Sequence, residues 1–324
     1  MIQQPPVPDL PARLEVLADL EPKVDELVRA HESRRELWQP SEVLAQGEPE
    51  SHADYVRGLA ERTRGIPDAC RVAIALNLVT EEGLPHFHRI LAMHFGDDTF
   101  WRTWTNLWTA EESRHGAVLR DYCRDSALLN PPVLERMQFE YLRAGFHPRW
   151  EHDPYRVFVY TSLQEKATQI SHANTGRRCA DYEPKLAAIL ARVATEEARH
   201  YAFYRQVFAA ILERDPDRAL ASAALVVPRL EMPGASMPHF EEIADVERRL
   251  GIYGPRDYLR IVEDQIRFWG IASLTGLGET GRRAQEKILG VPDRLRRTAE
   301  VIERRSRSKT FAFDLVWRRE FAVE

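Results

Sequence analysis

The sequence predicts an all-α protein: a bundle of long helices with a short strand or hairpin near the carboxyl end. Three observations lead to this fold class. Apolar residues recur at three- and four-residue steps through most of the 324 residues. Prolines stand where one such run ends and the next begins. Only the segment from Phe311 to Trp317 shows the alternation of apolar residues that is typical of a strand.

The helices follow in order from this pattern and its interruptions. Leu14, Leu17 and Leu20 begin the first apolar face, and Pro67 opens the second run. Gly96-Asp97-Asp98 closes that run, and Asp98 is the expected N-cap of the next helix. The predicted helices are 11–35, 67 to about 91, 98–125, 131–145, 154–175, 184–214, 216–230, 239–250, 256–270 and 278–305.

Composition limits the function. A hydrophobic content of 44% suits one globular domain, which we expect to span residues 1–324 with its core bundle at about 66–214. No apolar run approaches the 18 or so residues of a membrane span, and a net charge of −5 gives no reason to expect nucleic acid. Three scattered cysteines and the absence of a targeting pattern near the start suggest a cytoplasmic protein.

Two short segments nearly repeat each other. Residues 111–115 read EESRH, and residues 196–200 read EEARH, 85 positions later. In each, a Glu and a His stand three positions apart, so on a helix both side chains leave the same face. By composition alone such a five-residue pattern is expected on the order of 0.01 times. Solvated helix faces are the alternative, but Trp104, Leu107 and Trp108 add apolar residues to the first helix. Two such helices face to face make most of a two-metal site.

Two further carboxylates complete the predicted site. Glu81 precedes Glu112 by 31 residues, and Glu165 precedes Glu197 by 32, so each gap fits one helix-to-helix return. Both Glu81 and Glu165 follow apolar runs, where a carboxylate is costly unless it is paired or bound to metal. Carboxylate and imidazole ligands suit iron or manganese. The predicted ligand set is Glu81, Glu112, His115, Glu165, Glu197 and His200.

The segments around all four carboxylates resemble one family, the soluble acyl-carrier-protein desaturases, which are ferritin-like di-iron enzymes. Residues 80–85 (TEEGLP) resemble that family's TEEALP, and residues 108–116 (WTAEESRHG) resemble WTAEENRHG. Residues 160–168 (YTSLQEKAT) resemble YTSFQERAT, and residues 170–175 (ISHANT) resemble ISHGNT. The likeness runs from about residue 30 to the end. It implies a ferritin-like di-iron four-helix bundle with additional helices.

The resemblance also assigns roles around the metals. It implies that Thr168 lies beside the oxygen-binding side of the cluster, and that Trp38 and Trp108 match tryptophans associated with electron delivery. The family commonly has Asp where this chain has Glu196, so the acid is kept but lengthened in a hydrogen-bond path to His115 and a tryptophan. Which carboxylates bridge the irons stays open.

The implied activity is the O2-dependent introduction of a cis double bond into a fatty acyl chain carried on acyl carrier protein. The implied cofactors and partners are two Fe²⁺ ions per subunit, electrons from ferredoxin or a similar reductant, and a second copy of the chain in a homodimer. Ile90, Met93 and Pro148 are similar to positions that line the acyl channel in relatives, and core packing is the alternative for Ile90 and Met93.

Other functions share this ligand set. A di-iron oxygenase that hydroxylates a carrier-bound acyl group would use the same six residues. Iron storage and a non-catalytic relative are two further alternatives, but storage cages use chains near half this length. A last feature is the excess of six positive charges between Gly281 and Thr310, which is either a solvated helix face or a docking surface for an acidic partner.

Overall fold

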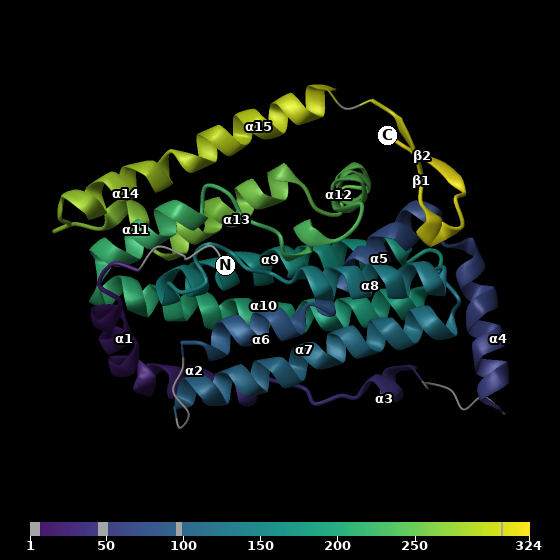
Figure 1. Ribbon diagram of the computed structural model, residues 1–324, viewed down its shortest axis with the longest axis horizontal. Helices are drawn as coiled ribbons and strands as arrows, with labels where there is room; N and C mark the ends of the chain where they lie inside the picture. Colours follow the sequence, from purple (N-terminus) through teal and green to yellow (C-terminus); the bar gives the residue numbers. More distant parts are fainter. Residues whose placement is uncertain (1–6, 45–50, 95–98, 306) are drawn as a thin grey trace.

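Long helices dominate the computed structural model, which describes residues 7–44, 51–94, 99–305 and 307–324 (Figure 1). The α-helices are α1 Leu10–Asp19, α2 Glu21–Glu32, α3 Pro40–Leu44, α4 His52–Arg62, α5 Asp68–Glu81, α6 Leu84–Ala92, α7 Phe100–Asp125, α8 Pro131–Ala144, α9 Pro154–Cys179, α10 Pro184–Arg214, α11 Pro216–Val226, α12 Phe240–Arg249, α13 Pro255–Phe268, α14 Glu279–Leu289 and α15 Val291–Arg305. The strands are β1 Lys309–Ala312 and β2 Glu320–Val323, which pair antiparallel.

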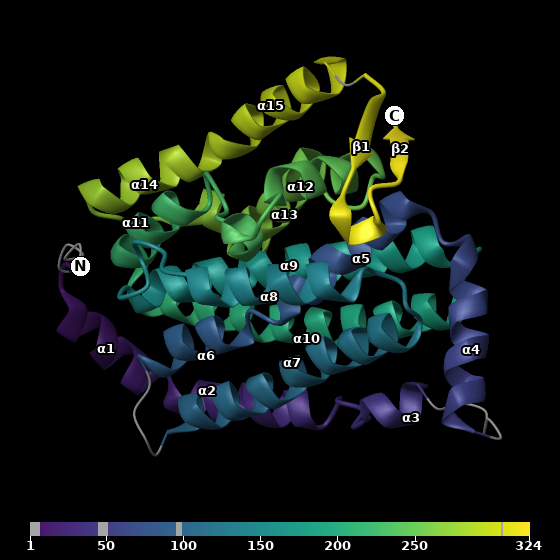
Figure 2. The same cartoon turned by 45° about the vertical axis from the view of Figure 1, so that its right-hand side comes forward.

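Four helices form the centre of the molecule. Helix α5 packs against α7 and α9, and α10 packs against α7 and α9, so two helix pairs face each other. Figures 1 and 2 show α8, α6 and α2 on the outside of this group. The arrangement is a ferritin-like four-helix core, and it confirms the predicted all-α class.

The local sequence explains where helices α9 and α10 start. The Asp153 carboxylate accepts hydrogen bonds from the backbone N–H groups of Tyr155 and Arg156, at 3.1 and 3.4 Å, at the start of α9. Glu183 caps α10 in the same way through Lys185 N, at 3.2 Å. Proline is the first residue of both helices. At this position a backbone N–H would have no hydrogen-bond partner within the helix, so proline loses nothing by lacking one.

The structure divides three of the predicted helices. The run 11–35 breaks at Leu20, the run from Pro67 breaks at 82–83, and the run 278–305 breaks at Gly290. A proline follows each break within the first turn of the next helix, where it lacks the N–H that continuous helix needs. The spacing of apolar residues continues across these breaks, so periodicity alone predicted one helix where the structure has two.

Other boundaries differ less. The expected cap Asp98 lies outside the described residues, and the side chain of Thr99 caps α7 through Arg102 N, at 3.3 Å. Helices α3 and α4 were not predicted. The C-terminal hairpin was predicted, but only residues 311–312 of the alternating segment lie in a strand, since residues 314–316 form a 3₁₀ turn.

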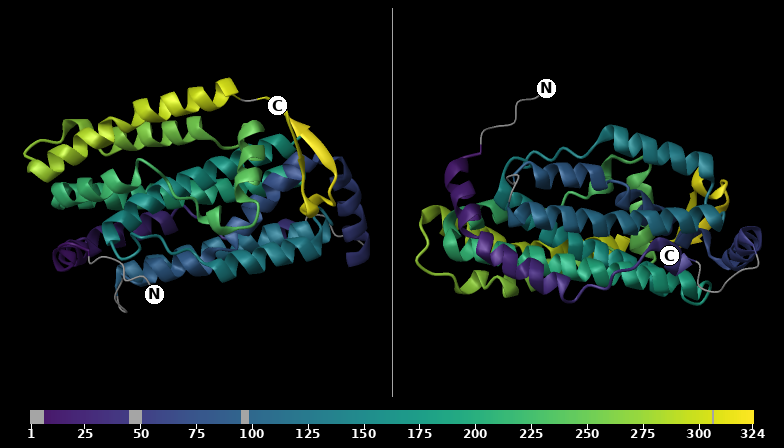
Figure 3. Two further views of the ribbon diagram at one scale, coloured as in Figure 1. Left: turned by 45° about the horizontal axis from the view of Figure 1, so that its top comes forward. Right: turned by 90° about the horizontal axis from the view of Figure 1, so that it is seen from below.

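Further helices cover the bundle. Helix α11 packs on α9 and α14, and α13 packs on α9 and α15, so α14 and α15 form an outer layer (Figure 3). On another side, α2 lies against α7 and α10. Among the described residues, no helix combines the length and apolar character that crossing a membrane requires.

Candidate metal centre

All six predicted ligands come together in the middle of the four-helix core. Glu81 ends α5, Glu112 and His115 lie midway along α7, Glu165 lies in α9, and Glu197 and His200 lie in α10. None of the six is more than 7% exposed. The i, i+3 spacing in α7 and in α10 gives each carboxylate an imidazole on the same helix face, as the repeat predicts.

The first group surrounds His115. Its Nδ1 lies 3.4 Å from Glu112 Oε2, 3.3 Å from Glu197 Oε1 and 3.8 Å from Glu81 Oε2. Ligand atoms of these four residues all lie within 4.8 Å of one another. This group has the size and the donor chemistry of a site for one divalent ion.

The second group surrounds His200. Its Nδ1 lies 2.7 Å from Glu112 Oε1, 3.8 Å from Glu165 Oε2 and 4.0 Å from Glu197 Oε2. Glu112 and Glu197 belong to both groups, and each directs one oxygen toward each histidine. Two shared carboxylates between two imidazoles are the arrangement that would bridge a pair of ions.

The six residues also fit a metal pair because several of their buried polar atoms lack hydrogen-bond partners. Both Glu197 oxygens and His115 Nδ1 are buried and have no hydrogen-bond partner among the described residues, and the buried His200 Nδ1 and Glu112 Oε1 lie 2.7 Å from each other. An unpaired buried polar atom costs free energy, and several in one place call for a common partner. A cation between these atoms would satisfy them.

Charge around the centre supports the same conclusion. Burial, with the nearby carboxylates of Glu197 and Glu112, raises the pKa of Glu165 well above its usual value. Burial and the charge of Glu112 raise the pKa of Glu197 to about 8. Burial opposes charge on His200, but hydrogen bonds to Glu111 and Glu112 and the charges of Glu112 and Glu165 raise its pKa to about 10. Burial opposes charge on Glu112 as well, but the charges and hydrogen bonds of His115 and His200 hold its pKa well below its usual value. Without metal, Glu165, Glu197 and His200 therefore hold protons, which bound cations would displace.

The Nε2 atoms of the two histidines, which face away from the centre, bond to Glu196 and Glu111. Each of these residues directly precedes a shared carboxylate in the sequence. His115 Nε2 donates to Glu196 Oε2, and His200 Nε2 donates to Glu111 Oε2, both at 2.9 Å. Each bond crosses between α7 and α10. A carboxylate on Nε2 fixes the ring and its tautomer, leaving Nδ1 to face the centre.

Glu196 also connects the centre to Trp38. Its carboxylate accepts from Arg114 at 2.9 and 3.2 Å, and the Arg114 guanidinium lies 5.3 Å from the ring centre of Trp38. Trp38 is 2% exposed, and its Nε1 has no hydrogen-bond partner among the described residues. The longer acid thus still reaches His115, and its contact with Trp38 runs through Arg114.

Trp108 and Thr168 lie on another side of the centre. Trp108 Nε1 donates to Glu165 Oε1 at 3.1 Å. Thr168 is half-buried and exchanges hydrogen bonds with Gln164, both at 2.8 Å. Thr168 and Gln164 line two small cavities of about 20 and 40 Å³, and the smaller of these also touches Trp108 and Glu112.

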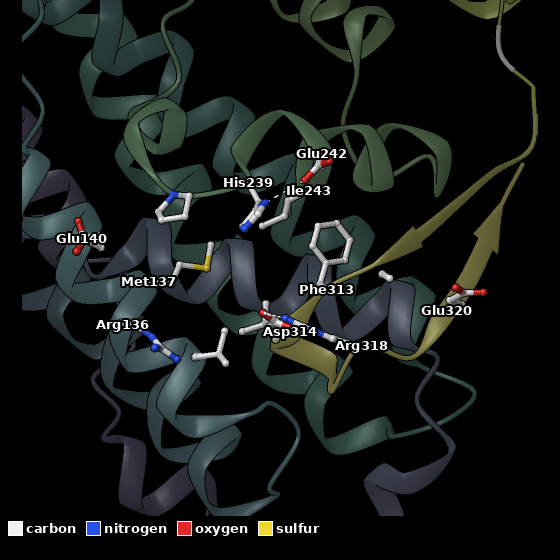
Figure 4. A pocket seen from close by; sticks show the side chains of 14 residues that line it. Arg136, Met137, Glu140, His239, Glu242, Ile243, Phe313, Asp314, Arg318 and Glu320 are labelled. Atoms are coloured by element: carbon white, nitrogen blue, oxygen red, sulfur yellow. Dashed lines mark hydrogen bonds and ion pairs between the residues drawn. The ribbon is translucent and has the colours of Figure 1, made fainter.

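The three predicted channel residues do not line these cavities. Ile90 is 3% exposed and belongs to the hydrophobic core, and Pro148 is buried. Met93 is 40% exposed and contacts His152 Nδ1 through its sulfur at 3.0 Å. Their channel role stays a prediction. A much larger cavity, about 830 Å³, lies apart from the candidate centre, between α8, α12 and the C-terminal hairpin (Figure 4).

Three buried residues beside the centre had no role assigned from the sequence. Glu111 holds His200, His172 Nε2 donates to Glu81 Oε1 at 2.7 Å, and His31 Nε2 bonds to Glu111 Oε2 at 2.9 Å. The repeat itself marks Glu111, because it occupies the position that Glu196 has in the second copy. His172 lies in the segment 170–175 already noted, whereas no sequence signal marks His31.

Comparison with known proteins agrees with the geometry. A family model described as fatty acid desaturase matches residues 12–317. Stearoyl-[acyl-carrier-protein] 9-desaturase 5 of Arabidopsis thaliana is 33% identical over 323 residues, covering 95% of this chain and 82% of the relative. Palmitoyl-[acyl-carrier-protein] 4-desaturase 3 of Ophrys sphegodes is 34% identical over 306 residues, covering 90% and 77%.

The fold has a counterpart among solved structures. The X-ray structure of DesA2 from Mycobacterium tuberculosis H37Rv matches with a TM-score of 0.61 at 20% sequence identity, covering 83% of this chain and 99% of that one. The family match spans nearly the whole chain, and the relatives above exceed 30% identity over most of their own length. This chain therefore belongs to the fatty acid desaturase family.

Proposed function

We propose that this protein is an acyl-[acyl-carrier-protein] desaturase, which uses O2 and two iron ions to place a cis double bond in a carrier-bound fatty acyl chain. The observation that carries the proposal is the pair of buried ligand groups that share Glu112 and Glu197. The names of the relatives supply the substrate class, since they act on stearoyl and palmitoyl chains on acyl carrier protein.

The proposed ligand roles follow from the distances. Glu81 and His115 would hold one iron, Glu165 and His200 would hold the other, and the two shared carboxylates would bridge them. When bound, the iron pair supplies O2 activation and the oxidising power to cleave an unactivated C–H bond, which no side chain provides.

The protein's own groups do the rest. Glu196 and Glu111 hold the Nε2 protons of the two histidine ligands, so both Nδ1 atoms keep a lone pair for metal. The aromatic and aliphatic core around the centre excludes bulk water. Thr168, with Gln164, lines the smaller cavity, which also touches Glu112, and this suits the proposed oxygen side.

Electron delivery is proposed to enter beside Trp38. The sequence of contacts from Trp38 through Arg114 and Glu196 ends at His115. Ferredoxin or a similar reductant is the proposed donor. Trp108, unlike Trp38, bonds directly to a proposed ligand, Glu165.

Acyl carrier protein is proposed to dock on the basic outer layer. Arg297 and Lys287 are exposed on α15 and α14 and make no ion pair among the described residues, so their charge is available to an acidic partner. Arg296 instead pairs with Asp293 and Glu263, at 2.6 and 2.7 Å, and is partly neutralised.

A homodimer and a cytoplasmic location complete the proposal. Two copies related by symmetry are the commonest assembly of soluble proteins. Helix α5 offers no apolar face to a second copy, because it is buried within its own chain at nearly every position. Sedimentation at twice the 37.4 kDa chain mass would support the dimer, and a clean monomer would contradict it. The relatives described above are chloroplastic, so the cytoplasmic location stays a prediction.

Mass spectrometry of the acyl chain tests the activity directly. The protein is incubated with a carrier-linked saturated acyl chain, a ferredoxin reducing system and O2, and the chain is then released and weighed. We expect a product that lacks two hydrogens. A product that gains one oxygen would identify a hydroxylase instead, and an unchanged chain would favour a non-catalytic relative.

A further inference from the structure

The two carboxylates that support the histidine ligands are held by different partners, although the sequence repeats around them. Each copy of the repeat carries an arginine, Arg114 in α7 and Arg199 in α10. Both guanidinium groups bond to Glu196, at 2.9 and 3.0 Å. Glu111 has no guanidinium nearer than Arg35, at 3.8 Å.

His31, from outside the four-helix core, takes the place of these arginines at Glu111. Its Nε2 lies 2.9 Å from Glu111 Oε2, the same oxygen that accepts from His200 Nε2 at 2.9 Å. His31 is 6% exposed near the end of α2, and its ring stacks on that of His200, with centroids 5.8 Å apart and planes 20° apart. The Trp104 ring lies edge-on to both rings, with its centroid 5.1 Å from that of His31 and 6.1 Å from that of His200.

This geometry limits the protonation of the three groups. One ionised carboxylate oxygen accepts but does not donate, so both Nε2 atoms that face it carry protons. With its proton on Nε2, His200 can direct the lone pair of Nδ1 at the metal position.

We propose that His31 is a positioning residue for one of the two metal positions, acting through Glu111 to fix the orientation and tautomer of His200. This inference rests on the proposed metal centre. It also makes the two positions unequal. Glu196, behind His115, accepts from two guanidinium groups, whereas Glu111, behind His200, bonds to the His31 ring and has Arg35 only at 3.8 Å. The less neutralised Glu111 leaves His200 the more basic ligand.

The chain offers a matched control in His172. Its Nε2 donates to Glu81 Oε1 at 2.7 Å, and the residue is fully buried, so it supports the other metal position with the same chemistry. The same substitution at the two histidines therefore compares the two positions. His31→Gln is the rescue variant, because it keeps an N–H donor on a side chain of similar reach.

The experiment is anaerobic titration of the metal-free, full-length protein with Co²⁺, followed by the d–d absorption of the bound ion, with thermal unfolding of the metal-free form as the fold control. Wild type should bind two equivalents. His31→Phe should weaken one equivalent by roughly 10-fold or more and leave the other unchanged, and His31→Gln should bind as wild type does. His172→Phe should weaken one equivalent, and the double variant should weaken both.

Each contrary result overturns a different part of the proposal. If wild type does not bind two equivalents, the proposed metal centre is wrong. If wild type binds two and His31→Phe leaves both unchanged, or weakens both alike, the positioning role is overturned. It is also overturned if His31→Phe and His172→Phe weaken the same Co²⁺ equivalent, so that the double variant weakens only that one. If His31→Phe does not fold, His31→Asn, whose amide is too short to reach Glu111, is subject to the same expectations.

Discussion

Glu112 and Glu197 each direct one oxygen toward each histidine, so these two residues belong to both proposed metal positions, whereas His200 belongs to one. The i, i+3 spacing made this cluster predictable, because the helical period alone places Glu112 beside His115 and Glu197 beside His200. Glu81 and Glu165 were predicted because they precede Glu112 and Glu197 by 31 and 32 residues, a gap that fits two antiparallel helices and their connection.

The supporting residues were predictable only in part. Glu111 and Glu196 are adjacent to ligands, so the repeat marks them, but which arginine meets which acid depends on how α7 and α10 pack. His31 lies 80 residues from Glu111, on a helix outside the core, and only tertiary structure brings the two together. The sharing of Glu112 and Glu197 between both ligand groups, on which their proposed bridging role rests, likewise needed coordinates.

Replacing a shared ligand should eliminate activity without unfolding the protein. Glu112→Ala should lower desaturation at least about 100-fold, because it removes a donor from both metal positions. Circular dichroism should show helicity close to wild type. The control is Glu82→Ala, which removes only a partly exposed ion pair with Arg120 and should keep full activity. Retained turnover in Glu112→Ala would overturn the site assignment.

Glu247 should make folding stability depend on pH. This carboxyl of α12 is 5% exposed, its hydrogen-bond contact is Ser171 Oγ at 3.5 Å, and burial raises its pKa to about 8. The folded state therefore holds the proton more tightly than the unfolded state does. The resulting stability is complete below the unfolded pKa of about 4.5 and is lost as pH rises through about 8.

The comparison of wild type with Glu247→Gln isolates that effect. Urea unfolding of the metal-free proteins from pH 5 to pH 9 should show wild type losing on the order of 3–5 kcal/mol relative to the variant. Parallel pH curves for the two proteins would mean that Glu247 ionises normally.

At the scale of elements, apolar periodicity located most of the helices but not all of their ends. Helices α7 and α10 were predicted to within a residue or two, because a capping residue and a turn bound each of them. The runs divided at Leu20, 82–83 and Gly290 were joined, since the proline after each break is compatible both with a kink and with a new helix start. Helices α3 and α4 are short, and their sequences carry a weak period.

Helix α14 is attached to α11 through a close approach of backbone to a side chain. Asp217 Oδ1 accepts from Gly281 N at 2.9 Å, and Asp217 Oδ2 accepts from Gly278 N at 3.2 Å. A Cβ at Gly281 would collide with the carboxylate that makes these bonds. Gly281→Ala should therefore lower the free energy of unfolding by about 1–3 kcal/mol.

Denaturant unfolding of Gly281→Ala and Gly65→Ala tests this. A Cβ at Gly65 meets nothing within 4 Å, so the second variant controls for the loss of glycine itself and should be close to neutral. Equal stability of the two variants would show that α14 tolerates a displaced Asp217.

At the scale of the whole molecule, the outer layer of α14 and α15 is exposed and basic, and it lies on the far side of the bundle from α2 (Figure 1). The sequence predicted its charge but not which charges are already paired. Exposure agrees both with a solvated face and with a docking surface, and charge reversal distinguishes the two.

Charge reversal on this layer should weaken the encounter with the carrier and spare the chemistry. Lys287→Glu with Arg297→Glu should raise the Michaelis constant for carrier-linked substrate by roughly fivefold and flatten its dependence on salt, with little change in maximal turnover. Arg34→Glu with Arg57→Glu, exposed residues of the region around α2 and α4, makes the same charge change elsewhere. If both pairs alter the kinetics equally across a salt series, the docking surface lies elsewhere.

The most direct test of the metal centre is the number of irons that one chain binds. Anaerobic titration of the metal-free protein with Fe²⁺, read by Mössbauer and magnetic circular dichroism spectroscopy, counts the ions and reports whether they are coupled. The shared carboxylates predict two Fe²⁺ per 37.4 kDa chain, magnetically coupled and unequal in their ligand fields. A single bound ion, or two ions without coupling, would contradict it.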